Sequence, residues 1–187
     1  MFEVVFLFVV VCFIEGFNIT NLNILIVLFV CSVLLIAPGV YSSFYGAPFV
    51  PSKNRNIKSI LKLGKFKNND VVVELGSGDG RIIREISLLN VKQAVGLEYS
   101  FFTHIFALFL KFIKRTKETL KWKNFWKFDF KNADVLVCFL MPDSMIEFKK
   151  KLWPKLRKGT RVLCNSFEIK DLPYLEKEND VFLYIKN

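Results

Sequence analysis

The sequence predicts an α/β protein built on a doubly wound, mostly parallel sheet of six to seven strands, preceded by an N-terminal transmembrane helix or helical hairpin. Three observations predict it: an apolar leader, strand-like and helix-like segments that alternate behind it, and a glycine-rich turn after the first strand. The chain has 187 residues, 52% of them hydrophobic. This length is close to that of one domain, and so apolar a composition excludes a disordered or collagen-like chain.

The leader carries almost no charge. Residues 1–52 contain no Lys or Arg and only two acids, Glu3 and Glu15. All 27 basic residues therefore lie in residues 53–187, which carry a net charge of +12, against +10 for the whole chain. The apolar and the basic parts of the chain must be interpreted separately.

The apolar run over residues 24–41 has 18 residues, enough to cross a hydrocarbon core that takes ~17–25 helical residues. The run over residues 2–17 is marginal and forms either the short arm of a hairpin or an interfacial segment. The positive n-region of a cleaved signal peptide is missing. We expect residues 1–45 to be a hydrophobic membrane anchor and residues 46–187 to be the functional domain; the alternative is a buried hairpin of a soluble protein.

Charge bias predicts the orientation of this anchor. Because positive residues stay on the cytoplasmic side of a membrane, the domain should face the cytoplasm, or the matrix if the protein belongs to a mitochondrion. The four cysteines of the whole chain show no zinc-ligand spacing and indicate small buried side chains, so no metal site is expected. The basic residues that closely follow the second run are Lys53, Arg55, Lys58, Lys62, Lys65 and Lys67.

The elements of the domain follow in order. Apolar residues at helical spacing over 56–63, followed by Gly64, predict an amphipathic helix that ends there. The continuous β-branched run Val71–Leu75 is typical of a parallel strand buried on both faces. Further strands are predicted at 94–98, around 125–128, and at 134–140, 161–167 and 181–185, with helices between them at 81–89, 101–117 and 144–151.

The glycine-rich turn carries the chemistry. It joins the first strand to the next helix, so that glycines allow a tight turn and let a ligand approach main-chain N–H groups at a helix N-terminus. Glu98 ends the next strand, where a carboxylate can accept hydrogen bonds from both ribose hydroxyls of a nucleoside. The turn itself consists of Gly76, Ser77, Gly78, Asp79 and Gly80.

With Glu74 in front, this spacing is E-x-G-x-G-x-G, which resembles motif I of the class I S-adenosylmethionine-dependent methyltransferases. Glu98 matches their second acidic motif. The dinucleotide fingerprint G-x-G-x-x-G fails, because Arg81 stands at its third glycine. The resemblance implies a Rossmann-like methyltransferase sheet with S-adenosylmethionine as cofactor. The implied cofactor-binding residues are Glu74, Gly76, Ser77, Gly78, Asp79, Gly80, Glu98 and Asn124.

Asn124 stands at the place that matches the end of the third strand in such families, where they often have Gly-Asp. Its amide can hydrogen-bond an adenine edge, and the alternative is a plain turn residue. The fourth strand leads to Asp143, beside the crevice where the methyl acceptor enters. Asp143 is the candidate catalytic residue that positions the acceptor amine; the alternative is a helix N-cap. An Asn-Pro-Pro-Tyr motif is missing there, which disfavours methylation of adenine N6.

A narrower resemblance covers residues 47–187. It is carried by the segment Ala47-Pro-Phe-Val-Pro-Ser52 before the glycine-rich turn and by the later stretches 132–135, 140–142 and 159–162. This part of the chain resembles the membrane-anchored protein-lysine methyltransferases that modify the c subunit of ATP synthase and the adenine nucleotide translocase, with their prokaryotic relatives. This resemblance implies methyl transfer to lysine ε-amines of a protein in or near a membrane. The alternatives are a lipid, quinone-precursor or RNA acceptor, or a non-catalytic cofactor-binding membrane protein.

Two basic clusters bear on the partners. Membrane lipid explains them better than nucleic acid does, because an apolar leader precedes them. His104, the only histidine, lies in a Phe-rich helix, where packing is a more ordinary role than catalysis. The Phe-rich face of that helix indicates a contact with the membrane or the leader. The clusters are Lys111, Lys114, Arg115, Lys117, Lys121 and Lys123, and then Lys149, Lys150, Lys151, Lys155, Arg157 and Lys158.

Overall fold

The structure is a computed structural model that describes residues 24–26, 28–29 and 50–187. The expected anchor, residues 1–45, lies outside the described residues apart from 24–26 and 28–29, which are helical. A helix long and apolar enough to cross a membrane was sought within the described part of the chain, and none was found there. The chain divides into two compact units, Met1–Pro48 and Phe49–Asn187, and the fold described below is that of the second unit.

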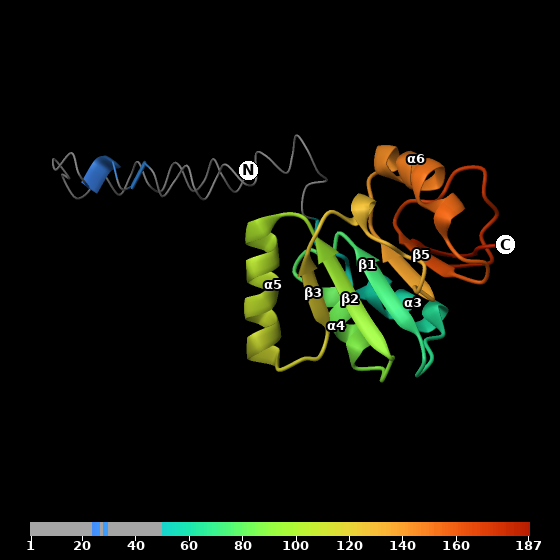
Figure 1. Ribbon diagram of the computed structural model, residues 1–187, viewed down its shortest axis with the longest axis horizontal. Coiled ribbons are helices and arrows are strands. Elements are labelled where there is room, and N and C mark those ends of the chain that lie inside the picture. The colour runs from blue at the N-terminus through green and yellow to red at the C-terminus, as the bar shows by residue number, and fades with distance from the viewer. Residues whose placement is uncertain (1–23, 27, 30–49) are drawn as a thin grey trace. The chain divides into compact units, whose positions relative to one another are not determined.

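Seven strands form one sheet in the order β3-β2-β1-β4-β5-β7-β6, so the chain starts in the middle and winds outward in both directions (Figure 1). The pairs among β1 to β5 are parallel, and β7 is antiparallel to both β5 and β6. The strands are β1 (Val71–Leu75), β2 (Gln93–Glu98), β3 (Thr119–Trp122), β4 (Val135–Cys138), β5 (Arg161–Asn165), β6 (Glu176–Glu178) and β7 (Val181–Ile185).

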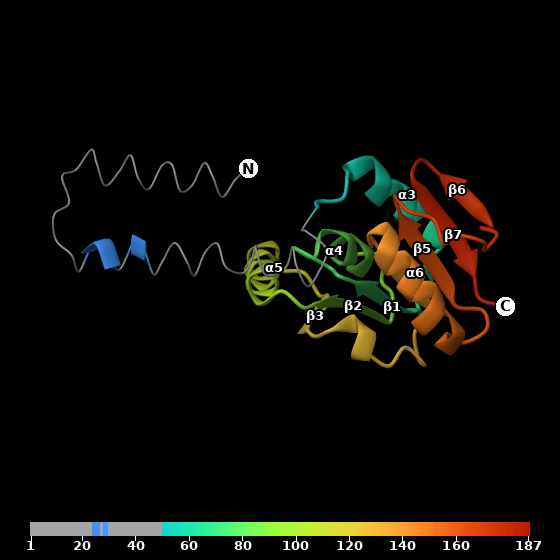
Figure 2. The same cartoon turned by 90° about the horizontal axis from the view of Figure 1, so that it is seen from above.

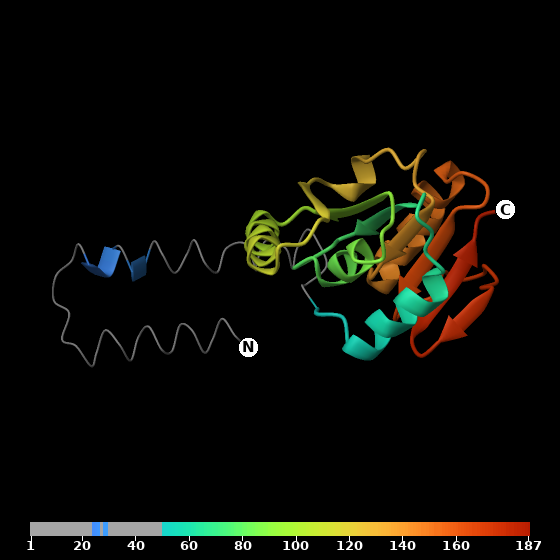
Figure 3. The same cartoon turned by 90° about the horizontal axis from the view of Figure 1, so that it is seen from below.

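Helices connect the strands and lie on both faces of the sheet (Figures 2 and 3). The first, α3, begins at Asn54 and ends at Gly64, where Lys65 adopts a left-handed conformation and stops the helix. The others are α4 (Arg81–Ser87), α5 (Phe101–Lys114) and α6 (Pro142–Lys151), with the short 3-10 helices η1 (Phe125–Lys127) and η2 (Trp153–Lys155).

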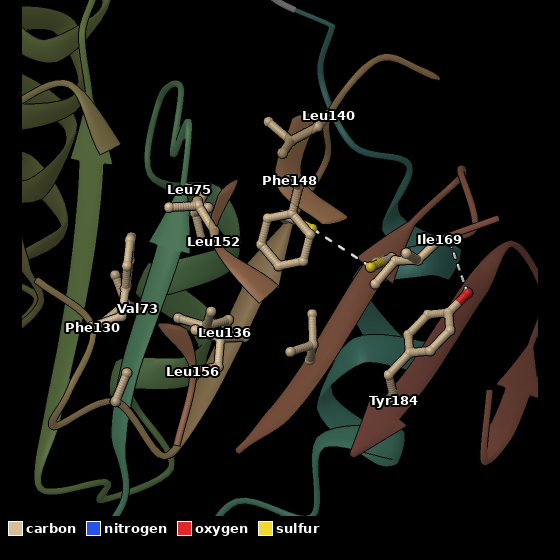
Figure 4. Close-up of a cluster of buried hydrophobic side chains, with 14 of the residues drawn as sticks. Val73, Leu75, Phe130, Leu136, Leu140, Phe148, Leu152, Leu156, Ile169 and Tyr184 are labelled. Carbon is tan, nitrogen blue, oxygen red and sulfur yellow. Dashed lines mark hydrogen bonds between the residues drawn. The ribbon is translucent and has the colours of Figure 1, made fainter. Parts of the chain in front are cut away.

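Alternation along the strands divides the core into two clusters. Val72 of β1 faces α3 and α4, whereas its neighbour Val73 faces α6. Figure 4 shows the cluster under α6, to which Phe148 of that helix and Leu136 of β4 both belong. Both faces of β1 and β4 are therefore buried, as the continuous apolar runs predicted.

Loop 166–175 after β5 is fixed by Tyr184 of β7. The Tyr184 hydroxyl accepts a hydrogen bond of 2.9 Å from the backbone N–H of Ile169 (Figure 4). Burial raises the pKa of Tyr184 to about 12, so the phenol stays protonated at neutral pH. Ile169 is itself buried in the cluster under α6, so this loop closes the core over β5 without a helix.

One expected strand is wrong, and two of the observed strands were not expected. The strand expected around residues 125–128 is η1, because the Asn124 side chain accepts from Trp126 N and so favours a turn over a strand. The third strand is instead Thr119–Trp122, an edge strand with little apolar alternation to mark it. The three-residue β6 completes seven strands, although its sequence Glu-Lys-Glu gives no apolar signal.

Candidate functional site

The glycine-rich turn leaves β1 at Leu75 and enters α4 at Arg81. Gly76, Gly78 and Gly80 all have positive φ, at 67°, 56° and 77°. Side chains are disfavoured in this left-handed region, which explains the glycine at each position. A Cβ built on Gly76 meets no atom within 4 Å, so this turn borders open space, as a cradle for a ligand requires.

Glu98 ties the ends of β1 and β2 together. Its Oε2 accepts from Gly78 N at 2.9 Å, and its Oε1 accepts from Ser100 N at 2.7 Å. The carboxylate is only partly buried. A carboxylate offers about four acceptor sites, so two remain after these backbone bonds. The geometry thus fixes the carboxylate of Glu98 beside the glycine-rich turn with capacity for two more donors.

Ser77 is pressed against β2. Its N–H donates to Leu97 O at 2.9 Å, whereas its buried Oγ has no hydrogen-bond partner among the described residues. A Cβ on Gly96 would come within 2.8 Å of that Oγ, which explains a glycine in the middle of β2. An unpaired buried hydroxyl costs free energy unless a ligand or water pairs with it.

Glu74, which was expected to bind the cofactor, lies in β1 with its carboxylate buried against α4. Its buried Oε2 accepts from Ile83 N inside α4 at 3.0 Å, so this carboxylate holds the start of the helix from behind the turn. Burial raises the pKa of Glu74 well above its ordinary value, and the charges of Asp79 and Glu98 raise it further. The hydrogen bond from the Ile83 N–H and, more weakly, the charge of Arg84 lower the pKa, but burial outweighs each of them.

Asp79 is engaged by arginines. It accepts from Arg81 Nη2 at 2.8 Å, and its backbone carbonyl accepts from the buried Arg84 at 2.9 Å. Burial alone would raise the pKa of Asp79, but hydrogen bonds and the charge of Arg81 outweigh it, and the pKa is lowered. Arg84 also pairs with the fully buried Glu118, at 3.3 Å. The ion pair of Arg84 with Glu118 positions the guanidinium group that binds the Asp79 carbonyl in the glycine-rich turn.

Asn124 lies next to Glu98 at the same edge of the sheet, because Lys123 N donates to Glu98 O at 2.9 Å. Its Oδ1 caps η1 by accepting from Trp126 N at 2.9 Å. Its amide nitrogen remains available as a donor toward an adenine edge. Both interpretations of Asn124, turn residue and ligand contact, are therefore compatible with this geometry.

Asp143 lies exposed in the first turn of α6. The N-cap position belongs to Met141, and Pro142 opens the helix, so Asp143 is not the N-cap. Strand β4 is next to β1, with Cys138 opposite Leu75, so the segment after β4 emerges beside the glycine-rich turn. No described contact joins Asp143 to that turn.

His104 is a buried packing residue. His104 is buried on the side of α5 that faces the sheet. Burial lowers its pKa below 6.5, and the charge of Glu98 only partly opposes this. His104 is therefore neutral at pH 7, and its Nδ1 finds no hydrogen-bond partner within the described residues.

The segment before α3, which contains Ser52, contacts the end of β5 and Arg81 of α4, and the sequence did not predict these contacts. Ser52 Oγ accepts from Asn165 Nδ2 at 3.0 Å at the end of β5, and Asn56 Nδ2 donates to Asn165 Oδ1 at 2.8 Å. Arg81 Nη1 donates to the Ser52 carbonyl at 3.3 Å. The only sequence signal for this buried polar cluster was the Pro-Phe-Val-Pro-Ser segment.

A groove of about 930 Å³ lies between α6 and the loop that follows β5. None of the predicted cofactor-binding residues lines it, so it is separate from the glycine-rich turn. It begins at Pro142, next to Asp143, and its floor is largely apolar. It is lined by Pro142, Met145, Ile146, Lys149, Lys150, Pro154, Ser166, Phe167, Glu168, Lys170, Asp171, Lys177 and Phe182.

The fold is that of known methyltransferases. An RNA methyltransferase from Salinibacter ruber, solved with S-adenosyl-L-homocysteine, superimposes with a TM-score of 0.68 at 22% identity over 73% of this chain and 94% of that chain. A ribosomal protein L11 methylase from Lactobacillus delbrueckii subsp. bulgaricus gives a TM-score of 0.56 at 14% identity, over 70% and 75%. The fold and the glycine-rich turn define an S-adenosylmethionine-dependent methyltransferase with a Rossmann-like sheet.

Residues 74–176 match the model of the ANTKMT methyltransferase domain, and the chain belongs to that family. A protein-lysine N-methyltransferase from Saccharolobus islandicus is 33% identical over 66% of this chain and 78% of its own length. A lysine N-methyltransferase from Xenopus laevis, named for the c subunit of ATP synthase, is 29% identical over 64% of this chain and 53% of its own. The chain thus spans about half the length of that relative. It is an enzyme of the protein-lysine methyltransferase family.

S-adenosylmethionine is the cofactor of this class, and the edge of the sheet fits it. The open side of Gly76, the unpaired Ser77 Oγ and the free acceptor sites of Glu98 lie together at one turn. Among the described residues, no three His, Cys, Asp or Glu side chains are grouped to hold a metal ion.

Proposed function

We propose that this protein methylates lysine side chains of a protein in or next to a membrane. Residues 46–187 form the methyltransferase domain, and residues 1–45 anchor it. The observation that carries the proposal is the family match over residues 74–176, which spans both Glu98 and the end of β4. The curated relatives that support the lysine acceptor are protein-lysine methyltransferases by name.

Binding of the cofactor rests on one edge of the sheet. In this proposal Glu98 accepts the ribose hydroxyls, and the backbone of Gly76, Ser77 and Gly78 receives the rest of the donor. Asn124 donates its amide N–H to adenine. Glu74 and Asp79 act through the turn: the first holds α4, and the second is held by arginines. When bound, S-adenosylmethionine supplies a methyl group already activated on a sulfonium.

The acceptor must lose a proton before it can react, since a lysine ε-amine has an ordinary pKa of ~10.4. We assign Asp143 to orient this amine and hold its proton, because an exposed carboxylate at the end of β4 lies where parallel α/β sheets admit a substrate. The groove beside Pro142 would receive apolar residues that flank the target lysine. Its lysines and acids at the rim suit a peptide of mixed charge.

Membrane anchoring is supported by the sequence of the leader. Its apolar run of 18 residues is long enough to span, and every Lys and Arg follows it. This distribution predicts a catalytic domain on the cytoplasmic side, or on the matrix side of a mitochondrial membrane. Several relatives are, by name, lysine methyltransferases of the ATP synthase c subunit, which supports an acceptor at a membrane.

The acceptor can be tested with membranes from cells that lack the protein. We expect the full chain and S-[methyl-³H]adenosylmethionine to label protein, with the label recovered as methyl-lysine after acid hydrolysis. The Glu98→Ala variant should leave the label at background, while the exposed Glu85→Gln variant on α4 should match the parent. Label in the lipid extract, in a quinone precursor or in RNA would refute the lysine assignment. Absence of all labelling would indicate a non-catalytic protein.

Anchoring has a separate test. The full chain should stay with the membrane pellet after extraction at high pH and be released by detergent. Recovery in the supernatant at high pH would refute a transmembrane anchor.

A further inference from the structure

Helix α5 exposes its apolar side and packs its less apolar side on the sheet, the reverse of an ordinary surface helix. Its inward side, which packs on β2 and β3, carries Thr103, His104 and Ala107. Its outward side is apolar over the whole length, with eight large side chains exposed by 38–82%. These are Phe101, Phe102, Ile105, Phe106, Leu108, Phe109, Phe112 and Ile113.

A surface helix normally buries its apolar side and turns its polar side to water. Scattered apolar side chains on a surface need no explanation, but a contiguous face of this length marks a contact. Helix α5 stands at the edge of the domain beyond β3, so no other element of the domain covers it (Figures 1 and 2). Something outside residues 50–187 must cover it.

Charge indicates what that is. Residues 99–131 contain eight basic residues and two acids. One acid, Glu118, is fully buried against Arg84, so only Asp129 faces solvent. The leader cannot complement these charges, because residues 1–52 offer only two acids. An anionic surface can. The basic residues at the C-terminal end of α5 and on β3 are Lys111, Lys114, Arg115, Lys117, Lys121 and Lys123.

Aromatic residues mark the other end of the face. Trp122 is 59% exposed and Tyr99 is 52% exposed. The Trp122 Nε1 donates to the Tyr99 carbonyl at 2.8 Å, and its ring meets Phe101 edge-on at 5.2 Å. Trp and Tyr with a satisfied polar tip are typical of the interface between water and lipid.

We propose that α5 lies in the plane of an anionic bilayer surface, with its Phe-rich face among the acyl chains near the headgroups and its basic residues on the lipid phosphates. Interfacial helices combine a strong apolar face with flanking Lys and Arg in this way. Because Tyr99 follows Glu98 directly, the contact holds the cofactor edge at the membrane surface. The inference extends the membrane association proposed above, and its test needs no methyl transfer.

The test uses the full chain in vesicles of phosphatidylcholine and phosphatidylglycerol, with and without lipid carrying a doxyl quencher near the headgroup. A Phe109→Trp variant reports from the middle of the face. A Leu175→Trp variant is the matched control, since Leu175 is also exposed and apolar but lies beside β6 at the opposite edge of the sheet. The leader tethers both variants equally, so only the local environment differs.

We expect quenching of the added tryptophan at position 109 at least twice that at position 175, together with a blue shift of its emission. Neutralising Lys114 and Lys117 by glutamine should reduce this difference, as should vesicles of phosphatidylcholine alone. Equal quenching at the two positions would overturn the proposal. A blue shift at position 109 without quenching would also overturn the proposal. If dilution then abolishes the shift, a second copy of the chain covers the Phe-rich face of α5. If dilution does not change the shift, the leader covers that face.

Discussion

Glu98→Ala is the sharpest test of the site, because the carboxylate does two things at once. It holds Gly78 N and Ser100 N, at 2.9 and 2.7 Å, and it keeps two acceptor sites for ribose hydroxyls. A hydrogen bond to a charged group contributes about 1.5–3 kcal/mol. Loss of both ribose bonds should cost about 3–6 kcal/mol, or about 10²–10⁴-fold in the Kd of the cofactor.

Glu98→Gln should fall between the parent and Glu98→Ala. The amide keeps one acceptor oxygen, but it turns a donor toward either Gly78 N–H or Ser100 N–H. We expect a loss of about one charge-assisted bond, about 10–100-fold in Kd. Isothermal titration of S-adenosylhomocysteine into the purified full chain measures both variants.

A folding control is needed, because Glu98 also fixes the turn. The thermal unfolding midpoint from circular dichroism shows whether each variant is folded, and Glu85→Gln, an exposed carboxylate on α4, should bind the cofactor like the parent. A folded Glu98→Ala protein with a Kd within about threefold of the parent would refute the ribose contact.

Three further perturbations follow from the structure. Gly96→Ala should destabilise by about 1–3 kcal/mol and weaken cofactor binding, because its Cβ meets Ser77 Oγ at 2.8 Å; a second change, Ser77→Gly, should restore stability in denaturant unfolding. Glu74→Gln should flatten the pH profile of stability. Burial raises the pKa of Glu74 in the folded protein, so the folded protein keeps a proton that the unfolded chain loses. The parent therefore loses stability as the pH rises from about 4.5 through the raised pKa, and the variant should not. Ile146→Glu in the groove should raise the KM for a protein acceptor about tenfold with kcat and cofactor Kd unchanged, since one buried apolar contact contributes about 1.5 kcal/mol. Ile185→Glu should not, because Ile185, at the end of β7, is equally exposed but does not line the groove.

Each of these has a contrary outcome. Failure of Ser77→Gly to restore the Gly96→Ala protein would mean that the clash lies elsewhere. A Glu74→Gln profile parallel to that of the parent between pH 4.5 and 8 would place the titration on another group. Equal effects of Ile146→Glu and Ile185→Glu on KM would remove the groove from the acceptor site.

The sequence predicted the strands and helices that have strong local signals. Strand Val71–Leu75 was predicted to the residue, because a continuous β-branched run between turn residues fits little else. It missed β3, a four-residue edge strand with little apolar alternation, and β6, whose three residues are all charged although it pairs with the neighbouring β7. It placed a strand over η1, because aromatic residues favour strands, whereas the capping bond of Asn124 and the backbone bonds of the turn favour a 3-10 helix.

For the candidate site, residue types were predictable and orientations were not. The position of Glu98 followed from the length of one strand–helix unit, but its bonds to Gly78 and Ser100 depend on how β2 packs against β1. The role of Glu74 as a cofactor contact stays a prediction, but its burial and its bond from Ile83 N of α4 could not be predicted from the sequence. The buried cluster of Ser52 and Asn165 joins segments more than a hundred residues apart, so no local pattern could reveal it.

The sequence by itself determined the class of enzyme, its cofactor and the division between an apolar leader and a basic domain. These depend on composition and on residues that are close together in the chain. Only the tertiary structure decided which side of α5 faces outward. Helical periodicity shows which residues share a face, but the face that is buried depends on the sheet beneath it, and here the sheet takes His104 and Ala107 and leaves the phenylalanines exposed.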